Sequence, residues 1–234
     1  MKALKDIEWS KYSQNGEDGI IEYLGRSISG YPYFVEIGCG SGKQNNTTWL
    51  AEQGWLGSVF DSRKKSIKKY CNRKFPQGIN AHCVEVTPEN CASTVNTSSE
   101  PAVFSIDIDS FDYHVVSALF QLGLRPSVAV LEYNAIFGLD PVTVPYPMPE
   151  VIKHFYFGCG VNAWRKLIEP YGYRFVTVDS AGVNAFFVRS DAITAPGIDD
   201  VEWLPWADCR WAAERYGPAE ERRKKIADKP LVWV

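Results

Sequence analysis

Two apolar stretches in the middle of the chain end in oxygen-bearing side chains. Asp107 and Asp109 close the run S-I-D-I-D, and Glu132 and Asn134 close L-E-Y-N. Because alternate residues of a strand share a face, the two side chains of each pair are expected to point the same way. If the two strands are neighbours, the carboxylates gather and repel one another unless a cation or a proton lies among them. Oxygen ligands suit Mg²⁺, Mn²⁺ or Ca²⁺, so these four residues form a predicted divalent-metal site.

The same acidic residues have two other interpretations. Asp109 or Ser110 could cap a helix that begins near position 111, with Asp112 in its first turn. Alternatively, a carboxylate works without a metal and exchanges a proton with a substrate. The residue types alone leave the metal, capping and acid–base interpretations open.

An earlier glycine-rich turn has the form of a nucleotide-binding loop. The run F-V-E-I-G-C-G-S-G places Glu36 before a turn with glycine at every second position. Glycine lacks Cβ, so a ligand can lie against the backbone, and the pattern is typical of the first turn of a Rossmann-like unit. The third glycine of a dinucleotide fingerprint would fall at position 43, where this chain has Lys43. An ordinary strand-to-helix turn is the alternative.

Asp61 closes the next apolar stretch, W-L-G-S-V-F-D. A carboxylate at the tip of the second strand can accept hydrogen bonds from both hydroxyls of a ribose. NAD and S-adenosylmethionine (SAM) both carry that ribose, so Asp61 indicates a nucleoside-bearing cofactor without choosing between them; a surface loop aspartate is the other interpretation. The predicted cofactor contacts at these strand ends are Glu36, Gly38, Gly40, Ser41, Asp61, Ser62, Val86 and Asp107.

Apolar runs alternate with helical stretches, which predicts a mostly parallel sheet with helices on both faces. The expected fold is one Rossmann-like α/β domain over residues 1–234, a three-layer αβα sandwich with seven strands. Strands at 172–179 and 183–189 are joined by S-A-G, too short for a parallel crossover, so they should form a terminal antiparallel hairpin. The other predicted strands are 33–38, 56–60, 79–86, 102–108 and 127–133, and the predicted helices are 15–26, 44–53, 63–72, 88–95, 111–122 and 160–169.

Two segments depart from this alternation. Residues 137–158 are rich in proline and aromatic side chains and follow the fifth predicted strand. They should therefore lie over the carboxyl edge of the sheet as a lid or wall for the substrate, although a packed loop is the alternative. The tryptophan-rich tail, 198–234, should pack on the sheet edge or on a partner subunit, so a homo-oligomer is one expected arrangement. No chemistry is assigned to this tail.

Composition argues against several classes of protein. The formal charge of −3 gives no overall attraction to nucleic acid or to membranes, and no apolar run approaches the roughly 20 residues of a membrane helix. The N-terminal stretch lacks the apolar segment of a signal peptide, and the six cysteines include no C-x-x-C pair. We therefore expect a cytoplasmic protein with reduced thiols. Basic residues between 63 and 74 are expected to form the solvated face of a helix, with a phosphate contact as the alternative.

Five stretches together resemble a known family. They are Y-S-Q-N-G-E-D-G-I-I (12–21), the turn around Glu36, I-D-I-D (106–109), L-E-Y-N (131–134) and G-V-N-A-F-F-V-R (182–189). Over roughly residues 10–190 the chain resembles an FkbM-like branch of the class I SAM-dependent methyltransferases. I-D-I-D also resembles the I-D-G-D stretch of the Mg²⁺-dependent macrocin-type sugar O-methyltransferases, which have an Asp-Asp pair where this chain has Glu132 and Asn134.

The resemblance implies methyl transfer from SAM to an oxygen of a sugar, polyketide or other small molecule. It also implies that Ser13 and Gln14 approach the methionine end of the cofactor. A hydroxyl becomes a good nucleophile only when a metal lowers its pKa or a base takes its proton. Asp109 and His114 are the predicted catalytic residues; His154 is the alternative base, and His114 could instead lie on a helix surface.

Two other functions compete with this one. A nicotinamide-dependent oxidoreductase would use the same ribose contact, but Lys43 and the terminal hairpin argue against it. A non-catalytic nucleotide-binding module could share the fold, since fold does not fix function. The presence of both Glu36 and Asp61 argues against that module. The [DN]-P-P-[YFW] motif of amino-group DNA methyltransferases is replaced here by I-D-I-D.

Overall fold

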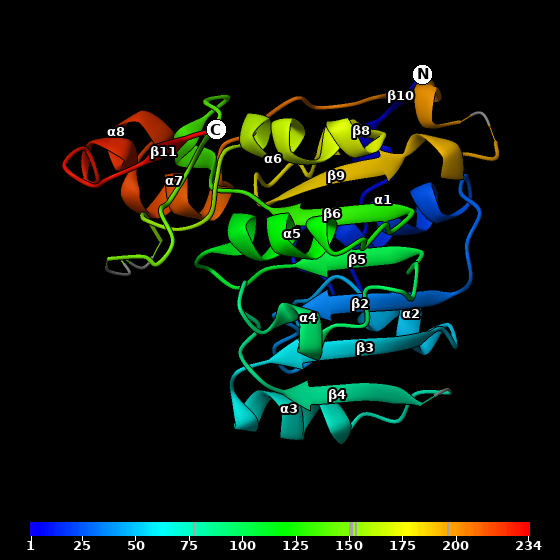
Figure 1. Cartoon of the computed structure of the whole chain (residues 1–234). Coiled ribbons are helices and arrows are strands. Elements are labelled where there is room, and N and C mark those ends of the chain that lie inside the picture. Colours follow the sequence, from blue (N-terminus) through cyan, green and yellow to red (C-terminus); the bar gives the residue numbers. More distant parts are fainter. Residues whose placement is uncertain (77, 150–151, 153, 196) are drawn as a thin grey trace.

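Seven strands form the central sheet of the protein (Figure 1). The computed structural model describes residues 1–76, 78–149, 152, 154–195 and 197–234. The order of the strands across the sheet is β4-β3-β2-β5-β6-β9-β8, so the strand that precedes the glycine turn, β2, lies next to the central strand β5. Their bounds are β2 (Tyr33–Ile37), β3 (Leu56–Asp61), β4 (Ile79–Cys83), β5 (Val103–Ile106), β6 (Val128–Glu132), β8 (Tyr173–Val178) and β9 (Asn184–Arg189).

The direction of the strands confirms the predicted fold. Strands β4, β3, β2, β5 and β6 are mutually parallel, whereas β9 runs antiparallel to both β6 and β8. The two last strands thus form the predicted hairpin, with a β-bulge between Phe175 and Thr177. Because parallel strands end at one edge, the sheet brings the ends of β2, β3, β4, β5 and β6 together.

Helices cover both faces of the sheet (Figure 1). Alternate residues of each central strand enter different cores: Phe34 and Val103 pack with the helices of one face, and Val35 and Phe104 with those of the other. The first face carries α1 (Glu17–Gly25), α2 (Thr48–Glu52) and α3 (Lys64–Cys71), and the second carries α4 (Cys91–Thr94), α5 (Asp112–Gln121) and α6 (Val161–Ile168). The result is the expected three-layer αβα sandwich.

The two irregular segments pack against each other. The insert contributes β7 (Val142–Thr143), which pairs antiparallel with β11 (Val232–Trp233) near the C-terminus. Val144 and Tyr156 of the insert form a small core with Ile226 of the tail. The tail also holds α7 (Arg210–Tyr216) and α8 (Ala219–Lys224), and Figure 1 shows both helices beside the insert.

The tail also follows the edge of the sheet. The amide of Val178, the last residue of the edge strand β8, donates a hydrogen bond to the carbonyl of Leu204 (3.0 Å). β10 (Val201–Glu202) pairs with β1 (Lys2–Ala3) near the N-terminus. Single-turn 3₁₀ helices complete the chain: η1 (Leu4–Asp6), η2 (Ala135–Phe137), η3 (Glu169–Tyr171), η4 (Ser190–Ala192) and η5 (Ile198–Asp200).

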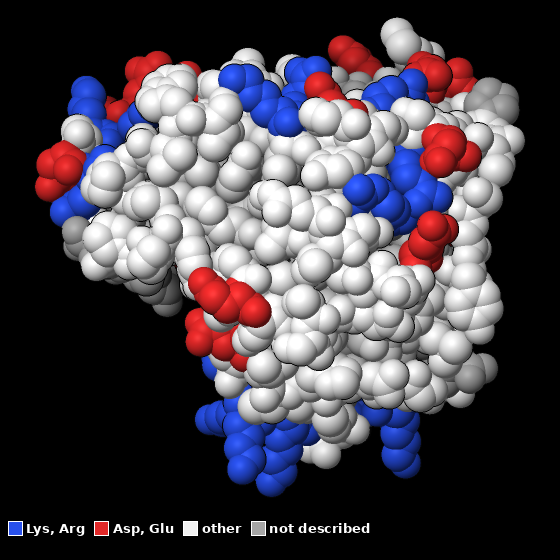
Figure 2. Space-filling view, in the orientation of Figure 1, with Lys and Arg blue, Asp and Glu red and all other residues white. Residues whose placement is uncertain are grey.

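Charge is unevenly spread over the surface. Figure 2 shows basic side chains gathered at the lower edge of the molecule, where Figure 1 places α3. Lys64, Lys65, Lys68 and Lys69 of this helix are exposed, as expected for a solvated helix face. None of the helices in the described ranges combines the length and apolar character that crossing a membrane would need.

Candidate functional site

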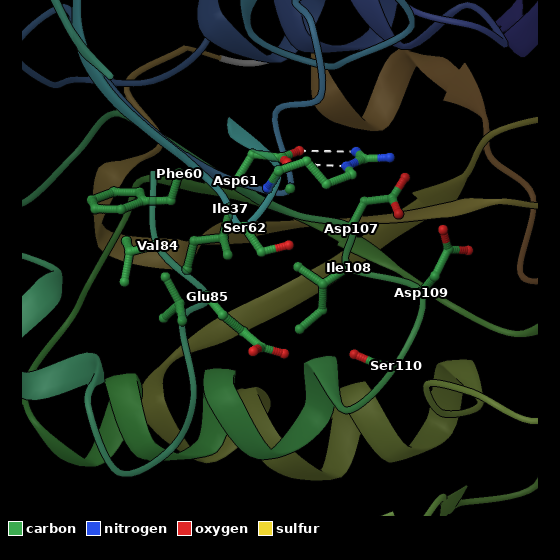
Figure 3. A pocket seen from close by; sticks show the side chains of 13 residues that line it. Ile37, Phe60, Asp61, Ser62, Val84, Glu85, Asp107, Ile108, Asp109 and Ser110 are labelled. Atoms are coloured by element: carbon green, nitrogen blue, oxygen red, sulfur yellow. Dashed lines mark hydrogen bonds and ion pairs between the residues drawn. The ribbon is translucent and has the colours of Figure 1, made fainter. Parts of the chain in front are cut away.

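A cavity of about 250 Å³ lies at the carboxyl edge of the sheet, beyond the ends of β2, β3, β4 and β5 (Figure 3). Phe60 and Val84 lie at one end of it, and Asp107 and Asp109 lie at the other. Its remaining lining residues are Ile37, Gly38, Asp61, Ser62, Arg63, Glu85, Val86, Ile108 and Ser110. The lining includes five of the predicted cofactor contacts, namely Gly38, Asp61, Ser62, Val86 and Asp107.

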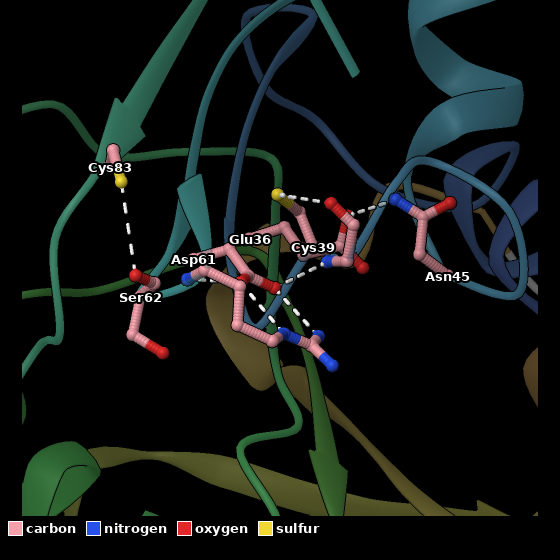
Figure 4. A network of polar contacts seen from close by, with 8 residues as sticks. Glu36, Cys39, Asn45, Asp61, Ser62 and Cys83 are labelled. Atoms are coloured by element: carbon pink, nitrogen blue, oxygen red, sulfur yellow. Dashed lines mark hydrogen bonds and ion pairs between the residues drawn. The ribbon is translucent and has the colours of Figure 1, made fainter. Parts of the chain in front are cut away.

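Glu36 is hydrogen-bonded to the loop that follows the glycine turn, and Figure 4 shows its contact with Asn45. Its buried carboxylate accepts hydrogen bonds from the Asn45 side chain (2.6 Å), the Asn46 amide (2.9 Å) and the Thr47 hydroxyl (2.6 Å). These bonds explain why α2 begins at Thr48 and not at the predicted position 44. Glu36 therefore fixes the loop of residues 45–47, which follows the glycine turn.

Burial gives the carboxyl group of Glu36 an unusually high pKa. Removal from water raises the pKa of its carboxyl group to about 7, although three hydrogen bonds favour the ionised form. Between its unfolded pKa near 4.5 and its folded pKa near 7, the native protein holds a proton that the unfolded chain releases. Native stability contributed by this group is thus fully present at low pH and is lost as the pH rises through about 7.

We therefore expect the free energy of unfolding to fall on the order of 2 kcal/mol between pH 5 and pH 8 because of Glu36. Urea unfolding at several pH values measures this slope. The variant Glu36→Gln cannot titrate, so its stability should depend less on pH even if it is lower throughout. A slope unchanged by Glu36→Gln would show that this carboxyl group is not the cause.

Gly38 lets the turn approach the end of β5. It has a φ of +91°, and a Cβ atom built on it would lie 1.7 Å from the carbonyl oxygen of Asp107. Only glycine fits this contact, which joins the first turn to the acidic residues after β5. The glycine pattern thus has a local reason in the packing of the two strand ends.

Asp61 is buried at the tip of β3 and is already fully hydrogen-bonded. Its carboxylate accepts from the Gly40 amide (2.9 Å) and from the amide (2.8 Å), Nε (3.0 Å) and Nη2 (2.9 Å) of Arg63. Burial alone would raise the pKa of Asp61, but these bonds hold it below its usual value. A carboxylate has about four acceptor positions, so a ribose can bind Asp61 only if the guanidinium of Arg63 moves away. The side chain of Arg63 is largely exposed and has room to do so.

Three carboxylates meet where β5 and β6 end. Oxygen atoms of Asp107, Asp109 and Glu132 lie within 4.8 Å of one another. β5 ends at Ile106, Asp109 has a φ of +55° in the loop beyond it, and Glu132 is the last residue of β6. The structure thus brings together the three predicted acidic ligands, and Asn134, the fourth, lines a cavity with them.

The charges of this cluster need compensation. The carboxyl groups of Asp107 and Glu132 lie close together, and the pKa of each is raised by burial and by the charge of its acidic neighbours, so the cluster favours a proton or a cation among its oxygens. Burial and the neighbouring charges of Asp109 and Asp112 raise the pKa of Asp107 to about 8. Burial and Asp107 raise the pKa of Glu132 as well. The Oε2 atom of Glu132 is buried with no hydrogen-bond partner, which fits a site for a hard cation.

The capping interpretation does not fit α5. The residue before this helix is Phe111, and no side chain caps it. Asp112 instead accepts hydrogen bonds from the amides of Ile108 (2.9 Å) and Ser110 (3.2 Å). The Asp112 carboxylate therefore shapes the loop that carries Asp109, and the Asp109 side chain stays exposed in the site.

A second cavity, of about 290 Å³, lies on the other side of Asp107 and Asp109. Both residues line both cavities, so the acidic cluster forms a shared wall. The second cavity is also lined by Glu132 and Tyr133 of the sheet and by His154 of the insert. The tail contributes Cys209, Trp211, Ala212 and Arg222.

That the tail lines this cavity was not predicted from the sequence. The helices of the tail are held by the buried Arg222, which donates hydrogen bonds to the Gly217 carbonyl and to the Asp208 carboxylate. Trp211 packs edge-on against His154, with ring centroids 5.0 Å apart. The runs R-W-A-A-E-R-Y and A-E-E-R-R-K, separated by G-P, are a helix-pair signal that could have indicated this element.

Other predicted site residues have mainly structural contacts. The Asn134 side chain donates to the carbonyls of Phe155 (2.9 Å) and Phe157 (3.1 Å) and accepts from Ile136 (3.2 Å), so its amide is committed to holding the insert. His114 lies against the insert, with its Nε2 2.8 Å from the Val144 carbonyl oxygen.

The remaining predicted contacts divide between the cavity walls and the loop. Gln14 lines the second cavity, whereas Ser13 is buried and accepts a hydrogen bond from the Asp18 amide (3.0 Å). Gly40 donates to Asp61, and the Ser41 carbonyl accepts from Arg73 (3.1 Å). Ser13, Gly40 and Ser41 thus support the turn.

Comparison of the sequence with known protein families and with curated proteins gave no match. Among solved structures, the chain is similar to a SAM-dependent methyltransferase from Clostridium acetobutylicum, with 12% identity over 74% of this chain and 89% of that chain and a TM-score of 0.49. It is similar to a SAM-dependent methyltransferase from Mesorhizobium loti, with 13% identity over 74% of this chain and 100% of that chain and a TM-score of 0.46. It is also similar to mitomycin 7-O-methyltransferase MmcR, with 12% identity over 73% of this chain and 53% of that chain and a TM-score of 0.45. At these identities, the function has to be argued from the site itself.

Proposed function

We propose that this protein is a SAM-dependent methyltransferase that transfers the methyl group to a hydroxyl oxygen of a small molecule or saccharide. The observation that carries the proposal is the shared wall: Asp107 and Asp109 line both the cavity at the ends of β2 to β5 and the cavity under the tail. A nucleoside cofactor in the first cavity and an acceptor in the second would meet at these carboxylates. Such an arrangement aligns two substrates for direct transfer.

The first cavity suits an adenosine. Asp61 can accept the ribose hydroxyls once Arg63 has moved, and Phe60, Val84 and Ile108 offer apolar contacts to a base. NAD also carries adenosine, so these contacts alone do not choose the cofactor. The terminal hairpin and the absence of a third glycine at Lys43 favour SAM.

The acidic cluster could activate the hydroxyl group of the acceptor, which is a poor nucleophile until it loses its proton. We propose that Asp107, Asp109 and Glu132 hold Mg²⁺ or Mn²⁺; the sequence also pointed to Asn134, but its amide is engaged by the insert. A bound divalent cation would lower the pKa of the acceptor hydroxyl. Asp109, the exposed member of the cluster, lines the second cavity, which supports a role as acceptor of the hydroxyl proton. His154 lines the acceptor cavity and is a second proton acceptor there, in preference to His114.

Methyl transfer tests this proposal directly. Protein incubated with methyl-labelled SAM, Mg²⁺ and a panel of sugars, phenols and hydroxylated natural products should transfer label to at least one acceptor. Membership of the FkbM-like branch and the cytoplasmic location are still predictions. The six cysteines are free in the structure, which fits a reducing compartment. Hydrolysis of SAM without transfer, or transfer only to nucleic acid, would contradict the proposed substrate class.

A substitution at Trp211 should affect binding of the acceptor without affecting binding of the cofactor. This residue lines the acceptor cavity beside His154 and lies outside the first cavity. We expect Trp211→Ala to raise the KM of the acceptor about tenfold, or 1.4 kcal/mol, while the Kd of the cofactor stays within about twofold. Trp233→Ala, which removes an exposed tryptophan of the same tail, is the matched control. Equal loss of both affinities would mean that Trp211 supports the fold instead.

A further inference from the structure

A third cavity, of about 780 Å³, lies between the insert and the loop after β5. It shares Arg63, Glu85 and Asp109 with the first cavity, and Asp109 and His154 with the acceptor cavity. A molecule whose hydroxyl group lies at Asp109 can therefore extend from the acceptor cavity into the third cavity. Pockets for small organic molecules have volumes of roughly 300–1,000 Å³, so the third cavity has room for a ring system of its own.

One wall of the third cavity is apolar and largely aromatic. It is formed by Tyr146, Pro147 and Met148 of the insert and by Ile108 and Phe111 of the loop after β5. The rings of Tyr146 and Phe111 pack edge to face, with their centroids 5.0 Å apart. Aromatic side chains and the sulfur of methionine both make favourable contacts with an aromatic ring. This wall therefore suits a flat aromatic group.

The ring of Tyr146 is held in position by contacts on several sides. Its hydroxyl donates a hydrogen bond to Oε2 of Glu89 (2.7 Å), and its ring centroid lies 5.6 Å from that of His114. Together with Phe111, these contacts fix the ring independently of any ligand. A preformed aromatic wall loses little side-chain entropy when a ligand binds to it.

Arg63 supplies a second surface for the same ligand. Its guanidinium holds Asp61 through Nε (3.0 Å) and Nη2 (2.9 Å), and a ribose at Asp61 would displace it. Because Arg63 also lines the third cavity, the displaced guanidinium can turn into that cavity, where Glu85 and Asp109 provide acidic neighbours. A guanidinium stacks favourably on the face of an aromatic ring.

We propose that the third cavity binds a flat aromatic ring system of the methyl acceptor, between the wall of Tyr146 and Phe111 and the displaced guanidinium of Arg63. The inference rests on the proposed function and narrows its substrate class to a hydroxylated aromatic compound. It also makes the cofactor and the ring bind cooperatively, since the ribose releases the guanidinium that covers the ring. Such coupling acts equally in both directions.

Titration of the intact protein with two alcohols tests the assignment. 2-Naphthol is flat and aromatic, whereas decahydro-2-naphthol has the same carbon skeleton and hydroxyl group without an aromatic ring. With saturating S-adenosylhomocysteine, 2-naphthol should bind at least about fivefold tighter than decahydro-2-naphthol. S-adenosylhomocysteine itself should tighten the binding of 2-naphthol by about threefold or more. Affinities of the two alcohols within twofold on wild-type protein, a comparison that depends on no variant, would overturn the assignment.

Variants locate the ring in the third cavity. Tyr146→Leu keeps an apolar side chain and should remove the preference for 2-naphthol. Tyr31→Leu, on an exposed tyrosine that lines none of the three cavities, should keep the preference. Arg63→Ala should abolish the gain that S-adenosylhomocysteine gives to 2-naphthol without weakening S-adenosylhomocysteine itself. A preference that persists in Tyr146→Leu would overturn the assignment.

The same titrations keep this inference apart from the proposed function. If S-adenosylhomocysteine does not bind, the proposed function fails, whereas the preference for 2-naphthol and its loss in Tyr146→Leu still decide whether the cavity binds an aromatic ring. Displacement of 2-naphthol by S-adenosylhomocysteine would assign the third cavity to the cofactor and overturn the proposal. Transfer of label from SAM only to acceptors without an aromatic ring would overturn it as well.

Discussion

Exhaustive removal of divalent cations should lower the rate of methyl transfer by at least about 10²-fold, since an acceptor hydroxyl would lose its activation. The physical reason lies in the cluster at the ends of β5 and β6, where burial and the neighbouring acidic groups raise the pKa of Asp107 and of Glu132. The measurement is the turnover of labelled SAM before and after treatment with EDTA. Added Mg²⁺ or Mn²⁺ should restore the rate.

Variants distinguish the site from an indirect effect of EDTA. Glu132→Gln should weaken Mn²⁺ binding and lower turnover, whereas Glu202→Gln, on an exposed residue of β10, should change neither. Asp109→Asn should not be rescued fully by excess metal. Binding of S-adenosylhomocysteine should survive EDTA because, in the proposed function, the nucleoside binds at the ends of β2 and β3 and not at the metal. Full activity after EDTA would remove the metal from the mechanism and leave Asp109 as a simple base.

Loss of Asp61 should weaken cofactor binding by about 2–3 kcal/mol, which is about 30- to 150-fold in Kd, because two hydroxyl donors lose a charged acceptor. Asp61→Ala, titrated with S-adenosylhomocysteine, measures this loss. The structure adds a second expectation that the sequence did not give. Arg63 occupies the acceptor positions that the ribose needs, so Arg63→Ala should bind the cofactor at least as well as wild type.

The pair of variants separates two roles of Asp61. If Asp61 acts only by holding Gly40 and Arg63, both variants should weaken the cofactor to a similar extent. If Asp61 binds the ribose, only Asp61→Ala weakens it. Adenosine alone, used as a second ligand, should show the same loss, since the contact lies on its ribose.

The acidic cluster could be predicted because it depends on local rules. Parallel strands end at one edge of a sheet, and β5 and β6 are neighbours in sequence as well as in space. Asp107 and Glu132 therefore meet for reasons visible in the sequence. Asp109 lies beyond the end of the strand and has a left-handed backbone conformation. The alternation of side chains along a strand therefore does not predict its position.

The roles of Asn134, His114 and the tail depended on long-range packing. The amide of Asn134 is held by carbonyls of Phe155 and Phe157, more than 20 residues away in the chain. His114 contacts the insert for the same kind of reason. Trp211 reaches the acceptor cavity only because the tail folds back over the sheet edge, and hydrophobic periodicity carries no information on such a return.

Titration of the purified protein with S-adenosylhomocysteine and, separately, with NAD⁺ tests the central claim most directly. We expect one molecule of S-adenosylhomocysteine to bind per chain with a Kd in the micromolar range, corresponding to about −8 kcal/mol, and no heat of binding with NAD⁺. Asp61→Ala should reduce the signal and Glu202→Gln should not. Binding of NAD⁺ with no response to S-adenosylhomocysteine would contradict the account and would identify the first cavity as a nicotinamide-cofactor site.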